Sequence, residues 1–72
     1  MSKQDKVHDL VYTRINGNNI KTYPVYVAML KSVTKTDIKD YASTWSYELC
    51  SGLYGTKIEM IEQIKNHITE GA

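Results

Sequence analysis

Hydrophobic and polar positions in the last third of the chain recur with the period of an α-helix. Thr56 is followed three residues later by Glu59, which is the pattern of a capping box, and this predicts that a helix begins here. One apolar stripe follows at helical spacing, made of Ile58, Ile61, Ile64 and Ile68. The intervening polar positions are predicted to face water, namely Glu59, Glu62, Gln63 and Asn66.

A second helical pattern precedes this one. Thr34 and Thr36 offer hydroxyl caps and Asp37 an early acid, and the apolar stripe that follows is Ile38, Tyr41, Ala42, Trp45 and Leu49. We predict one helix through this stripe to Ser51, ended by Gly52 in a left-handed conformation. Since only Leu53-Tyr54-Gly55 separates it from the last helix, the two apolar faces are predicted to pack together as an αα pair.

The first half of the chain fits two patterns. Val7, Leu10, Val11 and Ile15 have helical spacing, and Asn16-Gly17 would close that helix. A β-hairpin over residues 10–23 would instead place Thr13 opposite Thr22 and Tyr12 opposite Tyr23. Pro24 favours the first turn of a further helix that runs through Lys31.

These patterns predict a mainly α protein, a small bundle of three or four helices with a C-terminal helix-extension-helix pair. The alternative is an α+β fold with a short N-terminal β-hairpin over about residues 10–23 plus helices. At 72 residues the chain is expected to form one small domain, with frayed ends at about 1–5 and 71–72.

The composition narrows the classes of function. The chain is 42% hydrophobic and 24% charged, and no apolar run approaches the roughly 20 residues that span a bilayer. The segment from Met1 to Lys6 is polar, unlike a secretory signal, so a cytoplasmic location is expected, or a nucleoid-associated one if the chain binds DNA. The net charge of +1 gives no overall basic excess.

A helix, a short link and a second, capped helix are predicted to follow one another between about residues 35 and 68. The link and the second helix carry the segment Gly55-Thr56-Lys57-x-Glu59-x-Ile61-Glu62-x-Ile64. This order and this segment resemble the SAP, or helix-extension-helix, family of short DNA-binding modules. Gln63 stands where a basic residue is common in that family.

The resemblance implies a contact with the DNA backbone at the start of the last helix. The free N–H groups of Thr56, Lys57 and Ile58 would form an anion site for a phosphate. Lysines of the preceding helix would widen the basic surface, and the tyrosine of the link would lie against sugar or base. The implied nucleic-acid-binding residues are Lys35, Lys39, Tyr54, Gly55, Thr56 and Lys57.

A protein-binding module, such as an inhibitor or adaptor, is the alternative hypothesis. The chain has six tyrosines and one tryptophan but no phenylalanine, and aromatic residues with a polar tip are favoured at interfaces. A chain of this size cannot bury all of them. The candidates for a tyrosine-rich binding surface are Tyr12, Tyr23, Tyr26 and Tyr47. Such a surface would serve a protein partner or a homo-oligomer.

Catalytic chemistry has little support in the sequence. His8 and His67 lie near opposite ends of the chain, and neither has an acid and a nucleophile at a recognisable spacing. No phosphate loop, dinucleotide motif or metal-ligand cluster is present. We therefore expect a non-enzymatic protein with no cofactor and no metal site.

Overall fold

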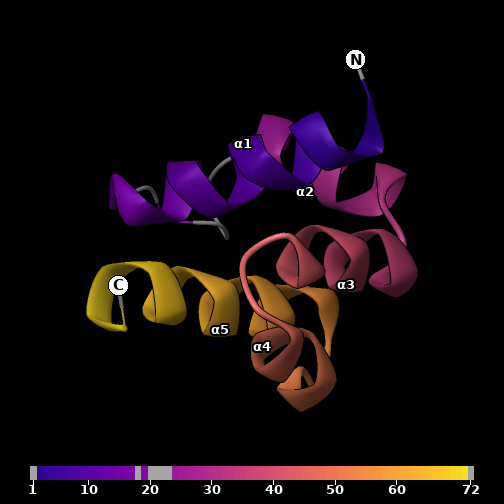
Figure 1. Cartoon of the computed structure of the whole chain (residues 1–72). Helices are drawn as coiled ribbons and strands as arrows, with labels where there is room; N and C mark the ends of the chain where they lie inside the picture. The colour runs from indigo at the N-terminus through magenta and orange to yellow at the C-terminus, as the bar shows by residue number, and fades with distance from the viewer. Residues whose placement is uncertain (1, 18, 20–23, 72) are drawn as a thin grey trace.

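A computed structural model describes residues 2–17, 19 and 24–71 of the chain. These residues form helices joined by short turns, with no strand among them (Figure 1). The mainly α prediction is therefore confirmed. The helices are α1 (Lys3–Ile15), α2 (Pro24–Ser32), α3 (Lys35–Ser43), α4 (Tyr47–Gly52) and α5 (Lys57–Glu70).

The helical alternative for the first half is the correct one. Ser2 caps α1 by accepting a hydrogen bond from the Asp5 N–H at 3.1 Å, so α1 begins inside the segment expected to be frayed. Gly17, at φ +89°, closes α1 as predicted. Residues 10–15 are helical, which rules out the first arm of the β-hairpin, while its second arm falls largely outside the described residues.

The single helix predicted from Ile38 to Ser51 is wrong, because this segment divides into α3 and α4. The Thr44 hydroxyl donates to the Tyr41 carbonyl at 2.6 Å, and Ser46 caps α4 by accepting from the Leu49 N–H. Such side chains compete with the helical backbone hydrogen bonds, which explains the break. Trp45, predicted to be in the apolar stripe, lies in this turn and is 43% exposed.

The glycine that adopts the left-handed conformation is also different from the one predicted. Gly52 is the last residue of α4 and has no positive φ, whereas Gly55 in the link has φ +87°. The turn into α5 therefore depends on Gly55.

Three helices enclose the core. Figure 1 shows α1 lying across α3 and α5, which is the arrangement that buries the apolar stripes of all three. The predicted αα contact between α3 and α5 is present, but α1 completes it. The α5 stripe is shifted from the prediction, since Met60 is buried and Ile58 is 41% exposed. The buried core residues of these helices are Val7, Leu10, Val11, Ile38, Tyr41, Ala42, Met60, Ile61 and Ile64.

The other two helices lie at the edges. α2 packs mainly on α1, to which it contributes buried Tyr26 and Leu30, and α4 packs mainly on α3. None of the helices in the described ranges is long and apolar enough to cross a lipid bilayer.

Candidate nucleic-acid interface

The start of α5 has the predicted capping box. The Glu59 N–H donates to the Thr56 hydroxyl at 3.2 Å, and the Thr56 N–H donates to the Glu59 carboxylate, also at 3.2 Å. The Thr56 N–H is therefore not free for a phosphate, contrary to the prediction. The backbone N–H groups of Lys57 and Ile58 remain, but the Glu59 carboxylate brings a negative charge to the same helix end by accepting from Thr56. The start of α5 alone is a weaker anion site than the sequence suggests.

Gly55 has a conformational role in this link. At φ +87°, a residue with a Cβ is strained, and a Cβ built there would lie 2.8 Å from the Glu59 carboxylate. Gly55 thus leaves room for the carboxylate that caps α5.

Tyr54 combines a fixed backbone with an exposed side chain. The side-chain amide of Gln63 accepts from the Tyr54 N–H at 3.3 Å and donates to the Tyr54 carbonyl at 2.9 Å. The side chain of Tyr54 is 70% exposed. Gln63, predicted to face water, therefore holds the link against α5 and leaves the tyrosine ring available to a ligand.

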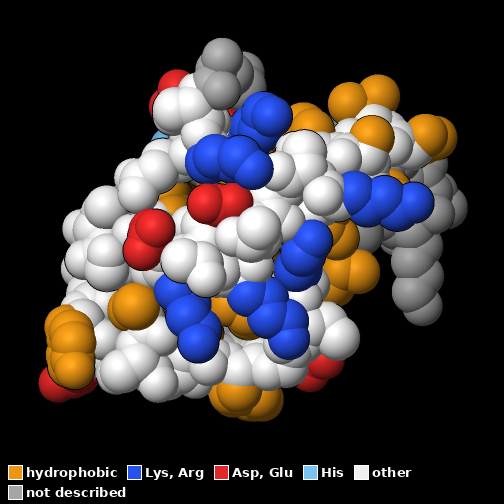
Figure 2. All heavy atoms as spheres, turned by 90° about the vertical axis from the view of Figure 1, so that its right-hand side faces the viewer, with side chains coloured by type: hydrophobic (Ala, Val, Ile, Leu, Met, Phe, Trp, Pro, Cys, Tyr) orange, Lys and Arg blue, Asp and Glu red, His pale blue; other side chains and the backbone are white. Residues whose placement is uncertain are grey.

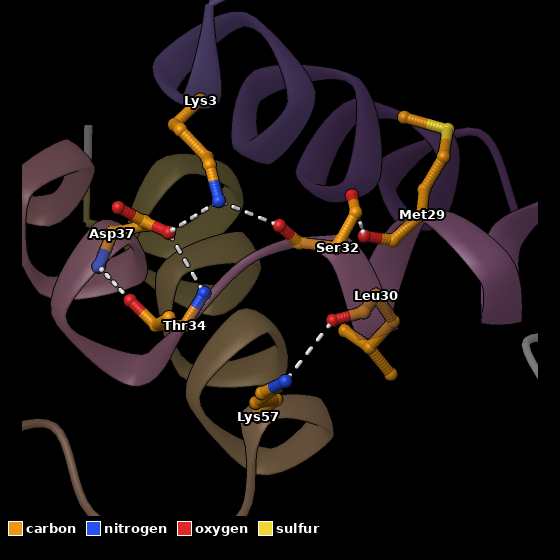
Figure 3. A network of polar contacts seen from close by, with 7 residues as sticks. All are labelled: Lys3, Met29, Leu30, Ser32, Thr34, Asp37 and Lys57. Atoms are coloured by element: carbon orange, nitrogen blue, oxygen red, sulfur yellow. Dashed lines mark hydrogen bonds and ion pairs between the residues drawn. The ribbon is translucent and has the colours of Figure 1, made fainter.

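Lys57 has a structural partner. Its Nζ donates to the Leu30 carbonyl at 3.3 Å, near the end of α2, where cations interact favourably with the helix dipole (Figure 3). In the same network, the Lys3 Nζ donates to the Ser32 carbonyl at 2.8 Å and lies 3.6 Å from the Asp37 carboxylate. Lys57 is thus not the mobile charge that the sequence suggests.

Lys35 and Lys39 are exposed and lie one turn apart on α3. No hydrogen bond or ion pair joins either side chain to another described residue. Between them, Asp37 completes a second capping box by accepting from the Thr34 N–H at 2.8 Å. That hydrogen bond, and secondarily Lys3, lowers the pKa of Asp37.

These contacts join the start of α1, the end of α2, the start of α3 and the start of α5. Figure 2 shows this side of the molecule, where several Lys and Arg side chains gather with acidic side chains between and around them. The helix ends that meet here carry Lys3, Lys31, Lys35 and Lys57, and Lys39 follows Lys35 one turn later on α3. We call these five residues the lysine face. The sequence analysis predicts nucleic-acid binding for three of these lysines, namely Lys35, Lys39 and Lys57. Lys3 and Lys31 join them only because the helix ends meet in the fold.

The four tyrosines of the alternative hypothesis do not share an exposed surface. Tyr47 is 80% exposed, as that hypothesis requires, whereas Tyr12 is half-buried and stacks on His8 with ring centroids 4.3 Å apart. Tyr26 is 2% exposed, and its hydroxyl donates to the Leu10 carbonyl. Its assignment to a binding surface is wrong, and burial raises the pKa of its hydroxyl. Tyr23 lies outside the described residues.

The sequence contains a signal for the burial of Tyr26. Tyr26, Leu30 and Val33 are spaced at i, i+4 and i+7, and all three are buried. In a helix as apolar as α2, this spacing does not by itself tell which side faces the core.

The His8 ring also approaches α3, with Nδ1 3.0 Å from the Tyr41 hydroxyl. Among residues 2–17, 19 and 24–71, no three His, Cys, Asp or Glu side chains are grouped so that they would hold a metal ion.

In comparisons with protein-family models, curated proteins and solved structures, nothing matches this chain.

Proposed function

We propose that this chain is a small non-enzymatic DNA-binding module that contacts backbone phosphates through the lysine face. The observation that carries the proposal is that four helix ends bearing Lys3, Lys31, Lys35 and Lys57 meet, with Lys39 one turn further along α3. Non-specific affinity for DNA comes mainly from such contacts between cations and phosphates.

The near-neutral total charge does not oppose this proposal. The chain has nine Lys and Arg residues against eight Asp and Glu residues, and a near-neutral total of this kind is compatible with an uneven distribution of charge over the surface. Local potential, rather than net charge, governs how a polyanion approaches a surface. Arg14 and Lys65 are both close to Glu62, at 2.6 and 3.6 Å, which partly neutralises them away from the lysine face.

The exposed lysines of α3 are the principal contacts in this proposal. Lys35 and Lys39 have no partner among the described residues, so binding a phosphate costs them no existing ion pair. Lys57 already donates to Leu30, and it supports the interface by joining α5 to α2. Tyr54, exposed in the link before α5, would lie against sugar or base in this proposal.

The resemblance to the SAP family supports the same proposal. The order α3, link and α5 follows that of a helix-extension-helix module, with α4 inserted before the link. The single helix predicted to run to Ser51 is in fact a short α3 followed by a separate α4.

The test is binding to a fluorescently labelled 20-base-pair duplex at several salt concentrations. Lys35→Gln and Lys39→Gln should each weaken binding by about eightfold at 0.1 M salt and reduce the salt slope by about one. Lys65→Gln is the matched control, because it removes the same charge from outside the lysine face. Equal losses in all three variants, or no binding by the parent chain at low salt, would exclude the proposed interface.

A further inference from the structure

Helix α2 is apolar on the side that faces away from the core as well as on the side that faces it. Its first seven residues, Pro24 to Leu30, are all hydrophobic, yet only Tyr26 and Leu30 are buried. Val25 is 63% exposed, the largest exposure of an aliphatic side chain among the large hydrophobic residues described. A helix that is apolar all round is normally covered on all sides.

The exposed side forms a continuous strip along the helix. We call it the outer face of α2 and define it by exposed Pro24, Val25 and Ala28 with half-buried Val27 and Met29 beside them. Ala28 lies one turn after Pro24, and its small side chain allows another helix to approach the backbone closely. The exposure of Pro24, Val25 and Ala28 shows that no helix of the described chain covers these three residues.

The charge beside the outer face identifies the kind of partner that fits it. Lys31 lies almost one turn after Ala28, is exposed, and belongs to the lysine face. No acidic residue occurs in α2, so a second copy of the chain would bring a matching apolar strip but no carboxylate from α2 to meet Lys31. An apolar strip that ends in lysines fits an amphipathic helix with acidic flanks.

We infer that the outer face of α2 docks an acidic amphipathic helix of a partner protein. The apolar side chains of that helix pack on Val25 and Ala28, and its carboxylates pair with Lys31 and with other lysines of the lysine face. A nine-residue helix is about 13 Å long, so the contact covers two to three turns of the partner. A contact of this size is typical of a weak, reversible complex.

The experiment uses the full chain, labelled with ¹⁵N, and a synthetic 16-residue peptide with leucines at i, i+3, i+4 and i+7 and glutamates at most other positions. Amide shifts on titration should be largest in residues 24–32. A second peptide with every glutamate replaced by lysine should bind at least tenfold more weakly. Val25→Asp and Ala28→Glu should each weaken binding of the acidic peptide at least tenfold, and both positions are exposed, so the variants are expected to fold.

Tyr47→Asp is the matched control, because it places the same charge at an exposed position on α4, which packs mainly on α3. It should leave the affinity for the acidic peptide unchanged. Several results would overturn the inference: equal affinity for the two peptides, shifts centred outside α2, or no binding of the acidic peptide by the folded chain. Two further results would overturn it by showing that the outer face of α2 binds something else. One is dimerisation of the chain that Val25→Asp abolishes, and the other is binding to phosphatidylserine vesicles but not to the acidic peptide. The titration contains no DNA, so its result tests this inference independently of the DNA-binding proposal.

Discussion

The hydroxyl of Tyr26 donates a hydrogen bond of 2.9 Å to the backbone carbonyl of Leu10, joining α2 to α1. Both residues are buried, and α2 packs mainly on α1. This bond therefore helps to set the position of the helix that carries Lys31 and the outer face of α2.

Replacing Tyr26 with phenylalanine tests that role. Tyr26→Phe should lower the free energy of unfolding by about 1 kcal/mol, since it removes a buried hydrogen bond and keeps the packing of the ring. Urea denaturation followed by circular dichroism measures the change. Tyr47→Phe removes a hydroxyl from an 80% exposed side chain and should alter stability by less than about 0.5 kcal/mol. Equal effects in the two variants would contradict the structural role of the bond.

The two glycines of the α4–α5 region should respond oppositely to alanine. Gly55→Ala should destabilise the chain by about 1–3 kcal/mol, because the residue has φ +87° and its Cβ would meet the Glu59 carboxylate. Gly52→Ala should be neutral or stabilising by up to about 1 kcal/mol, because Gly52 ends a helix and open space surrounds its Cβ position. Thermal unfolding of the pair measures both, and destabilisation by Gly52→Ala alone would refute the assignment of the turn to Gly55.

Gln63 should control the order of the link. Gln63→Ala removes both hydrogen bonds to the Tyr54 backbone, so the Tyr54 amide should exchange with solvent several-fold faster than in the parent chain. Hydrogen exchange followed by NMR measures this rate. Asn66→Ala, an exposed position on the same helix, is the control and should leave the Tyr54 rate unchanged.

Asp37 should make stability depend on pH. Its pKa is lower in the folded chain than in the unfolded chain, chiefly because the Thr34 N–H donates to its carboxylate. Such a group contributes stability above its unfolded pKa of about 3.9, and this contribution is lost as the pH falls through the folded pKa. Urea midpoints between pH 6 and pH 2 should show Asp37→Asn less stable than the parent at pH 6, with the difference shrinking as the pH falls.

Asp40→Asn is the control for that series. Asp40 is exposed, and no ion pair joins its side chain to another described residue. At pH 6, Asp40→Asn should lower the urea midpoint much less than Asp37→Asn does, because it removes no capping hydrogen bond. A difference between Asp37→Asn and the parent that stays constant down to pH 2 would mean that the capping carboxylate contributes no pH-dependent stability.

Local patterns were sufficient to predict the helices whose signals lie within a few residues. The capping box of Thr56 and Glu59 and the closing Asn16-Gly17 are such signals, and both are present in the structure. The break between α3 and α4 was not predicted, because the apolar spacing continues through Trp45 to Leu49. Hydrogen bonds of the Thr44 and Ser46 side chains decide that break.

The sequence by itself determined the mainly helical class and the start of α5, because caps and periodicity act within one or two turns. Only the tertiary structure decided that Tyr26 is buried, that Lys57 donates to Leu30, and that the helix ends bearing Lys3, Lys31 and Lys35 meet. Each of these depends on helix ends far apart in the chain. The contacts between α1, α2, α3 and α5 bring those ends together, and no local spacing encodes them.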